Sequence, residues 1–224
     1  MAIKKIPNYV LPEYQEAVKN KINWEIEREK AVLLIHDMQV YFTDAYDKAG
    51  EPFQTIIRNM IALKEVCREN KIPVVYSAQP EGQLPSQRGL LLDFWGAGIP
   101  AGQKKQDITK ELQPDTDDLV ITKWRYSAFE NTSLEELMKK WGKSQILITG
   151  IYAHIGCLTT AVAASMKNIK PFVIADAMGD FSREKHCLSL DYIGQLAGMI
   201  LDTAQVVKVL KNHDAGSVKP ELSA

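Results

Sequence analysis

Residues Ala31 to Ile35 read AVLLI, a short apolar run that ends directly before His36 and Asp37. The run shows no alternation of polar and apolar residues, which is typical of a strand covered on both faces. Similar runs follow at Pro73 to Tyr76 (PVVY), Leu119 to Ile121 (LVI), Gln145 to Thr149 (QILIT), Pro171 to Ala175 (PFVIA) and Met199 to Leu201 (MIL). The sequence therefore predicts six buried strands.

Segments with the apolar periodicity of helices lie between these runs. They are Phe53 to Asn70, Ser133 to Trp141, Leu158 to Lys167 and Lys185 to Gly198. Buried strands that alternate with helices predict βαβ crossovers, and hence a parallel sheet with helices on both faces. In such a sheet a ligand binds beyond the carboxyl ends of the strands. The stretch from Pro80 to Asp118 interrupts this alternation, and a connection of that length is usually functional or a lid.

The charge balance excludes several classes of partner. The 224 residues include 27 Lys and Arg against 28 Asp and Glu, a formal net charge of -1. Such a chain exerts no broad attraction on a phosphate backbone or an anionic bilayer, so nucleic acid and membrane partners are not expected. No apolar run approaches the length of a membrane span, and no apolar segment follows the N-terminal lysines, so we expect a cytoplasmic protein.

The cysteines give no sign of a structural framework. Cys67, Cys157 and Cys187 are odd in number and form no C-x-x-C pair. Neither a disulfide framework nor a zinc knuckle is expected from this pattern.

Two charged residues directly follow predicted strands. Asp37 either projects into a ligand crevice or caps the following segment, and its position alone does not decide between the two. His36 should point to the opposite face, because successive strand residues alternate, so we expect it to be a core histidine rather than a partner of Asp37. Lys123 repeats the pattern after a later strand, within an apolar setting that includes Trp124 and Phe129.

A third strand end carries glycine. Gly150 ends the strand QILIT, and Gly156 precedes a helical pattern. We expect free backbone N–H groups at a helix start near Gly156, which would suit a carboxylate or a developing oxyanion.

Six short motifs occur along the chain, and both their residues and their order matter for the interpretation. They are HDMQ-x-YF at His36 to Phe42, YSAQP at Tyr76 to Pro80, DFWG at Asp93 to Gly96, TKWRYSAF at Thr122 to Phe129, TGIYAHIGC at Thr149 to Cys157 and PFVIADA at Pro171 to Ala177. Together they resemble the isochorismatase family, and more narrowly the isochorismatases of catecholate siderophore synthesis. The resemblance extends to about residue 207.

The resemblance implies a three-layer α/β/α fold with a Rossmann-like, doubly wound, mostly parallel sheet of six strands. It also implies hydrolysis of isochorismate to 2,3-dihydro-2,3-dihydroxybenzoate and pyruvate, without a cofactor. We expect a single hydrolase domain over 1–224, with a core of about 30–207, an N-terminal extension at 1–29 and a tail at 214–224. No aryl carrier domain is expected, so the chain would be a stand-alone or a truncated isochorismatase.

One departure from the wider superfamily concerns its nucleophile. Nicotinamidase-like amidohydrolases use an Asp-Lys-Cys triad, whose cysteine sits where this chain has Gly156; Cys157 is one residue later. One residue turns a helical side chain by about 100°, so Cys157 should point away from the crevice. Those amidohydrolases also hold a metal through Asp and His residues after the second strand, and SAQPEGQ at 77–83 contains no histidine. We therefore expect neither a thiolate nucleophile nor a metal.

A site with Asp37 and Lys123 but no thiolate or metal suits the hydrolysis of a vinyl ether, because one correctly placed acid is enough for that reaction. Asp37 is the candidate acid, and the role requires desolvation by residues such as Phe42 and Trp95 to raise its pKa. Lys123 opposes this, so protonation of Asp37 would depend on a substrate carboxylate that offsets the charge of Lys123.

The resemblance also implies how a dianionic substrate is held. The expected catalytic positions are Asp37, Lys123 and Gly156, and the expected substrate-binding residues are Phe42, Gln79, Arg88, Trp95, Tyr126, Ile151 and Tyr152. Strand-like alternation would turn Arg125 the same way as Lys123 and Tyr126 the other way. The family commonly has a non-proline cis peptide near Ile151 and Tyr152.

Two alternatives stay open at the level of sequence, besides a docking module without catalysis, which intact Asp37 and Lys123 disfavour. The same chemistry could act on 2-amino-2-deoxyisochorismate in a phenazine pathway, or the chain could be a cysteine-dependent amidohydrolase that uses Cys157. Family habit further suggests a homo-oligomer, a dimer or larger, that docks to siderophore synthetase components.

Overall fold

The computed structural model describes residues 3–12 and 20–212. Six strands form one sheet in the order β3-β2-β1-β4-β5-β6, and each neighbouring pair is parallel. Their bounds are β1 Ala31–His36, β2 Val74–Ala78, β3 Leu119–Thr122, β4 Gln145–Ile151, β5 Lys170–Gly179 and β6 Met199–Leu201. The strand order reverses direction between β1 and β4, which makes this the switch point where ligands bind in open α/β sheets.

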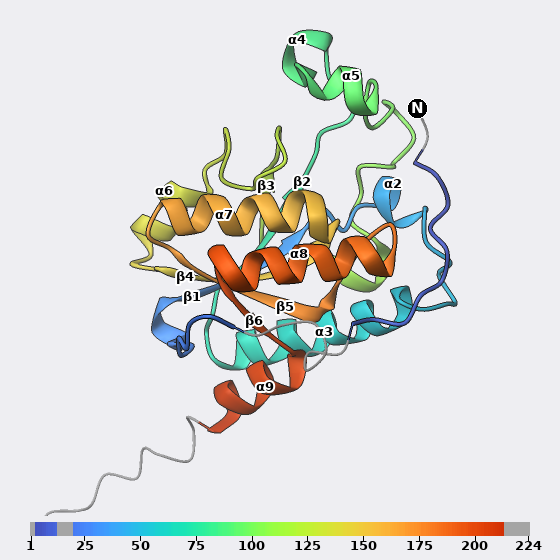
Figure 1. The fold of residues 1–224 in the computed structure, drawn as a ribbon. Coiled ribbons are helices and arrows are strands. Elements are labelled where there is room, and N and C mark those ends of the chain that lie inside the picture. Colours follow the sequence, from blue (N-terminus) through green and yellow to red (C-terminus); the bar gives the residue numbers. More distant parts are fainter. Residues whose placement is uncertain (1–2, 13–19, 213–224) are drawn as a thin grey trace, which may run out of the picture.

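Helices cover both faces of this sheet, so the fold has the three layers that we expected (Figure 1). One face carries α3 (Phe53–Glu69) and α9 (Thr203–Asn212), and the other carries α6 (Leu134–Lys140), α7 (Leu158–Met166) and α8 (Arg183–Leu196). The shorter elements are η1 Arg28–Lys30, α2 Val40–Thr43, α4 Pro85–Arg88, α5 Leu91–Trp95, η2 Lys110–Leu112 and the π-helical turn η3 Ala153–Cys157.

Strand β1 shows why its residues form the centre of the fold. All six of its residues are buried. Leu33 and Ile35 pack in the cluster with α3 and α9, whereas Val32 and Leu34 pack in the cluster with α6, α7 and α8. Because strand residues alternate between faces, only a continuous apolar run can fill both layers.

The predicted strands and helices are confirmed, with differences at their ends. Strand β4 continues to Ile151 and β5 to Gly179, beyond the apolar runs that indicated them. The helix α9 was not predicted. The prediction that every strand is buried was wrong for β3, because β3 lies at the edge of the sheet and exposes half of Val120.

The end of β4 depends on a glycine. Gly150 has φ +107°, and a Cβ there would lie 2.2 Å from the backbone oxygen of His36. The register between β4 and β5 also shifts between Ile148 and Gly150. Glycine thus lets β4 bend closely over the end of β1, where the two central strands meet the ligand side of the sheet.

The long connection after β2 contributes α4 and α5, which lie at the top of the molecule in Figure 1, apart from the main body of helices. In 3–12 and 20–212, no helix is both long and apolar enough to cross a membrane. The predicted tail at 214–224 and part of the predicted extension at 1–29 lie outside the described residues, and the single-domain organisation stays a prediction.

Candidate active site

Side chains from the ends of four parallel strands meet at the switch point. Asp37 follows β1, Gln79 follows β2, Lys123 follows β3, and Tyr152 follows β4. Parallel strands present their carboxyl ends at one edge of a sheet, so residues up to 115 positions apart come together here.

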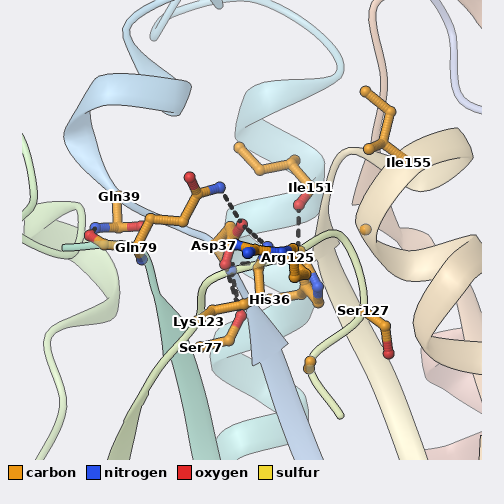
Figure 2. Close-up of polar contacts among 12 residues, drawn as sticks. His36, Asp37, Gln39, Ser77, Gln79, Lys123, Arg125, Ser127, Ile151 and Ile155 are labelled. Carbon is orange, nitrogen blue, oxygen red and sulfur yellow. Dashed lines mark hydrogen bonds and ion pairs between the residues drawn. The ribbon is translucent and has the colours of Figure 1, made fainter. Parts of the chain in front are cut away.

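An ion pair lies at the centre of the site. Lys123 Nζ is 2.9 Å from Asp37 Oδ2, and both side chains are almost fully buried. Ser77 Oγ donates to Asp37 Oδ1 at 2.6 Å, and Gln79 Nε2 donates to Oδ2 at 3.2 Å (Figure 2). Lys123 Nζ also donates to the backbone oxygen of Arg125 at 2.6 Å. The carboxylate is therefore held by three side chains from β2 and β3 and the segments that follow them.

The electrostatics of Asp37 depend on opposing effects. Burial raises the pKa of Asp37, but Lys123, His36 and the hydrogen bond from Ser77 outweigh it and hold this pKa below the ordinary value of 3.8. The opposition from Lys123 that we expected therefore prevails in the free protein, because the cation and the donors favour the charged form more than burial opposes it. Protonation of Asp37 requires a change in this environment.

His36 lies closer to Asp37 than strand alternation suggests. Its Nδ1 is 3.8 Å from Asp37 Oδ1, because Asp37 leaves the strand with φ +49° and turns back toward the ring. The ring does not pair with the carboxylate; Nδ1 donates to the backbone oxygen of Ile151 at 3.0 Å. Burial lowers the pKa of His36 to about 4, so the ring is neutral near pH 7. The expectation of a buried core histidine agrees with these contacts.

Position 156 lacks a side chain, and the neighbouring thiol lies elsewhere. Cys157 is fully buried in the cluster with α7 and α8, and its Sγ lies 3.9 Å from the backbone oxygen of Thr149. Burial and Asp37 raise the pKa of this thiol well above its ordinary value. Such a thiol is inert, because the reactive form of cysteine is the thiolate.

The helix start expected at Gly156 was misplaced. Helical conformation begins earlier, in the π-helical turn η3, and Gly156 lies in the second half of that turn. The amides of Ile155 and Cys157 both donate to the backbone oxygen of Tyr152. The cis peptide between Ile151 and Tyr152 is present, as predicted.

A cavity of about 490 Å³ opens at this edge of the sheet. All ten residues that the sequence indicated line it: Asp37, Phe42, Gln79, Arg88, Trp95, Lys123, Tyr126, Ile151, Tyr152 and Gly156. The structure thus brings together residues from four strand ends and from the long connection that contains α4 and α5.

Aromatic rings and a buried arginine shape the walls of this cavity. Trp95 Nε1 donates to Tyr126 Oη at 2.9 Å, which links α5 to the segment after β3. Arg88 is 5% exposed and donates to Gln79 Oε1 at 3.0 Å, so it is no solvated loop residue. Because Gln79 in turn donates to Asp37, Arg88 and Gln79 form a chain of contacts that ends at the carboxylate.

Sequence reasoning missed several residues of the cavity. Arg125 was not among the expected site residues, yet it lines the cavity together with Tyr126, which was expected. Strand alternation fails here, because β3 ends at Thr122 and the following backbone is no longer extended strand. Further lining residues come from the N-terminal segment and from other walls: Ile3, Lys4, Lys5, Ile6, Tyr41, Leu91, Phe94, Ile155, Phe181 and Lys185. Ser77 was missed as well, although its position at the end of β2 offered the same signal as Asp37.

The charges around the cavity are strongly one-sided. Six cationic side chains line it: Lys4, Lys5, Arg88, Lys123, Arg125 and Lys185. Among the residues that the structure describes, Asp37 is the one carboxylate in the lining, and no cysteine, serine or threonine is present there. The near-neutral net charge therefore hides a local excess of positive charge that suits an anionic ligand.

The side chains around Asp37 are poor ligands for a metal ion. Within 3–12 and 20–212, no group of three or more His, Cys, Asp or Glu side chains could hold a metal ion. The polar groups nearest to Asp37 are a lysine, a serine and a glutamine amide, which donate hydrogen bonds rather than supply the anionic ligands that a cation prefers.

The fold and this site define an α/β protein of the hydrolase type, with a cation-rich pocket at the switch point of a parallel sheet. The family model of the isochorismatase domain matches residues 31–205. The chain belongs to the isochorismatase family.

Relatives in this family align with the chain over most of their own length. The chain is 47% identical to the isochorismatase of Bacillus subtilis strain 168, over 96% of this chain and 69% of the relative. It is 44% identical to enterobactin synthase component B of Escherichia coli strain K12, over 92% and 73%. It is 38% identical to the phenazine biosynthesis protein PhzD of Pseudomonas fluorescens, over 92% and 98%.

A solved structure supports the fold alone. The cysteine hydrolase from Pseudomonas syringae pv. phaseolicola 1448A superposes with a TM-score of 0.78 at 20% identity, over 87% of this chain and 98% of that one. The three-layer arrangement with a parallel sheet of six strands is therefore confirmed.

Proposed function

We propose that this protein is a hydrolase that splits the enolpyruvyl ether of isochorismate into 2,3-dihydro-2,3-dihydroxybenzoate and pyruvate, in catecholate siderophore synthesis. One observation carries the proposal: the buried pair of Asp37 and Lys123 lies in a cation-rich, aromatic cavity whose described lining contains no cysteine, serine or threonine. The relatives named isochorismatase and enterobactin synthase component B support the same substrate and pathway.

The cavity suits the charges and the ring of this substrate. Isochorismate carries two carboxylates, and the lining offers six cationic side chains against the single carboxylate of Asp37. Phe42, Trp95 and Tyr152 offer apolar surface to the ring. Tyr152 packs against Phe181 with 4.3 Å between ring centroids and a tilt of 38°, and both rings line one wall of the cavity.

The reaction needs a proton and one water molecule. Asp37 gives its proton to the terminal methylene carbon of the enolpyruvyl group, and an oxocarbenium-like centre forms at the ether carbon. Water adds to that carbon, the resulting hemiketal loses a proton, and its C–O bond breaks to release pyruvate while the ring oxygen takes a proton. Protons and water balance without a covalent intermediate on the protein.

The lowered pKa of Asp37 in the free protein sets a condition on this role. A substrate carboxylate beside Lys123 would offset the charge of the lysine, and the bound ring would exclude water, so both changes would raise the pKa of Asp37. Substrate binding thus prepares the acid.

The decisive assay measures pyruvate release from isochorismate. We expect turnover by the unaltered protein and a loss of about 10² to 10⁴-fold in Asp37→Asn, since this is the usual contribution of a general acid. Cys157→Ala, which removes a thiol that does not line the cavity, is the control and should keep near-normal turnover. Near-normal turnover in Asp37→Asn, or loss of turnover after alkylation of thiols, would contradict the assignment.

A second substrate has support from relatives named for phenazine biosynthesis. The resemblance to PhzD favours a test with 2-amino-2-deoxyisochorismate, which requires the same protonation and differs by one substituent. Parallel assays of the two compounds decide between them, and we expect the higher kcat/KM for isochorismate. A higher kcat/KM for the amino compound would transfer the proposal to a phenazine pathway.

We further propose a single cytoplasmic domain with its core at about 30–207, which forms a homo-oligomer and docks to siderophore synthetase components. Family resemblance supports these points. Light scattering after size-exclusion chromatography checks the oligomer, and a mass equal to one chain would contradict it.

A further inference from the structure

Gly156 is glycine because a neighbouring ring occupies the space of its side chain. A Cβ at this position would lie 2.1 Å from His36 Cε1 and 2.8 Å from each ring nitrogen of His36. Contacts below 3.0 Å do not occur between unstrained atoms of this kind. The φ of Gly156 is not in the left-handed region, so backbone conformation does not require glycine here. The requirement comes from His36.

The ring of His36 is buried and hydrogen-bonded, so moving it aside is costly. His36 lies on the central strand β1, is fully buried, and pairs in register with Ser77 and Gly150. Its Nδ1 donates to the backbone oxygen of Ile151, and this oxygen belongs to the cis peptide between Ile151 and Tyr152. A rotation of the ring would break this hydrogen bond inside the protein, where an unpaired donor is costly.

The location of this contact gives it chemical meaning. Gly156 lines the cavity together with Asp37 and Lys123, and His36 Nδ1 lies 3.8 Å from Asp37 Oδ1. A cysteine at position 156 would therefore stand beside a carboxylate and a cation, which is the setting that activates a thiol nucleophile. His36 fills the volume that such a side chain would need.

We infer that His36 and Gly156 form a matched pair that decides the class of reaction: His36 keeps position 156 free of a side chain, so the site works by proton transfer and not through a nucleophile. A nucleophilic side chain can enter at 156 only when His36 is replaced by a smaller residue. The chemical consequence rests on the proposed function, whereas the steric exclusion does not.

The test is a double-mutant cycle with Gly156→Cys and His36→Val. Valine lacks the ring atoms that approach Gly156 and suits a buried strand. Urea unfolding measures stability, and iodoacetamide labelling followed by peptide mass analysis measures access to the thiol at 156, with the native Cys187, a partly exposed thiol, as internal reference. His186→Val is the matched control, because His186 is equally buried and does not contact Gly156.

We expect Gly156→Cys to lower the midpoint of unfolding at least twice as far in the parent as in the His36→Val background, and His186→Val to give no such relief. In His36→Val/Gly156→Cys the thiol at 156 should label stoichiometrically and at least ten times faster than in Gly156→Cys. A Gly156→Cys protein that does not fold, beside a double variant that does, supports the inference equally.

Three results would overturn it: equal destabilisation by Gly156→Cys in both backgrounds, equal labelling rates at 156, or a double variant that fails to fold while His36→Val folds. Should His36→Val itself fail to fold, Gly156→Ala in the parent still decides, because an unchanged unfolding midpoint there refutes the exclusion and a strongly lowered one supports it. Absence of pyruvate release by the unaltered protein would count against the proposed function and would leave these comparisons unaffected.

Discussion

Lys123 Nζ lies 2.9 Å from Asp37 Oδ2 in a pair whose side chains are 2% and 7% exposed. The two residues are 86 positions apart in the chain and meet because β1 and β3 end at the same edge of the sheet. Each charge is buried only because the other is present, since an isolated charge in such a place would be costly.

This pair should therefore show strong coupling in stability. We expect Asp37→Asn to lower the free energy of unfolding at pH 7 by about 3 kcal/mol, because Lys123 is then left without its countercharge. The double variant with Lys123→Met should recover at least half of that loss, since the uncompensated charge is gone. Urea unfolding of the four proteins measures the coupling, and strictly additive effects would show that the pair is not coupled.

Acid should destabilise the protein in two separate ranges of pH. Burial lowers the pKa of both His36 and His186 to about 4, from an ordinary value of 6.5. Below pH 6.5 these two histidines therefore bind protons in the unfolded chain but stay neutral in the folded protein. The free energy of unfolding falls as the pH drops toward 4. Each histidine should contribute at most about 1.4 kcal/mol per pH unit across this range.

The histidine range can be checked with one substitution. His186→Asn removes one titrating group, so the slope of unfolding free energy against pH between 6.5 and 4 should fall by about half. Asp37 acts in a lower range: its folded pKa is below 3.8, so its contribution is complete above 3.8 and is lost as pH falls further. An unchanged slope in His186→Asn would mean that His186 is not held neutral.

Lys4 should contribute to binding without contributing to chemistry. It is exposed, lies in the N-terminal segment and lines the cavity. Under the proposed function we expect Lys4→Gln to raise KM for the dianionic substrate by about 2 to 5-fold, the equivalent of 0.4 to 1 kcal/mol for an exposed charge, with kcat unchanged. Lys208→Gln, an exposed lysine on α9 that does not line the cavity, is the control. Equal KM values in the two variants would exclude a role for Lys4.

Gly150→Ala should be among the most damaging small substitutions. Its Cβ would meet the backbone oxygen of His36 at 2.2 Å, in a backbone conformation with φ +107° that other residues rarely adopt. Backbone atoms of two central strands cannot separate without breaking their ladder, so we expect a loss of at least about 3 kcal/mol in unfolding free energy. Gly142→Ala, where φ is also positive but nothing lies within 4 Å, should cost much less. Similar losses would show that conformation, and not contact, governs Gly150.

The sequence was sufficient for the layout of the fold and for ten of the residues that line the cavity. The apolar run at 31–35 indicated a strand covered on both faces, because it is too short for a buried helix and alternates along the chain with segments of helical periodicity. The charges that directly follow such strands, Asp37 and Lys123, had to share one edge of a parallel sheet. Periodicity and strand ends are local properties, so they can be read from neighbouring residues.

Only the tertiary structure decided the electrostatics and the fit of individual side chains. Whether Asp37 is charged depends on the balance between burial and the effects of Lys123, His36 and Ser77, of which Ser77 comes from β2 and Lys123 from the segment after β3. The N-terminal segment reaches the cavity through the fold, and no pattern within it signals a ligand. That His36 fills the place of a side chain at Gly156 likewise depends on distances across 120 residues of chain. Such contacts between distant segments exist only in the folded chain, because their energies depend on separations of a few ångströms.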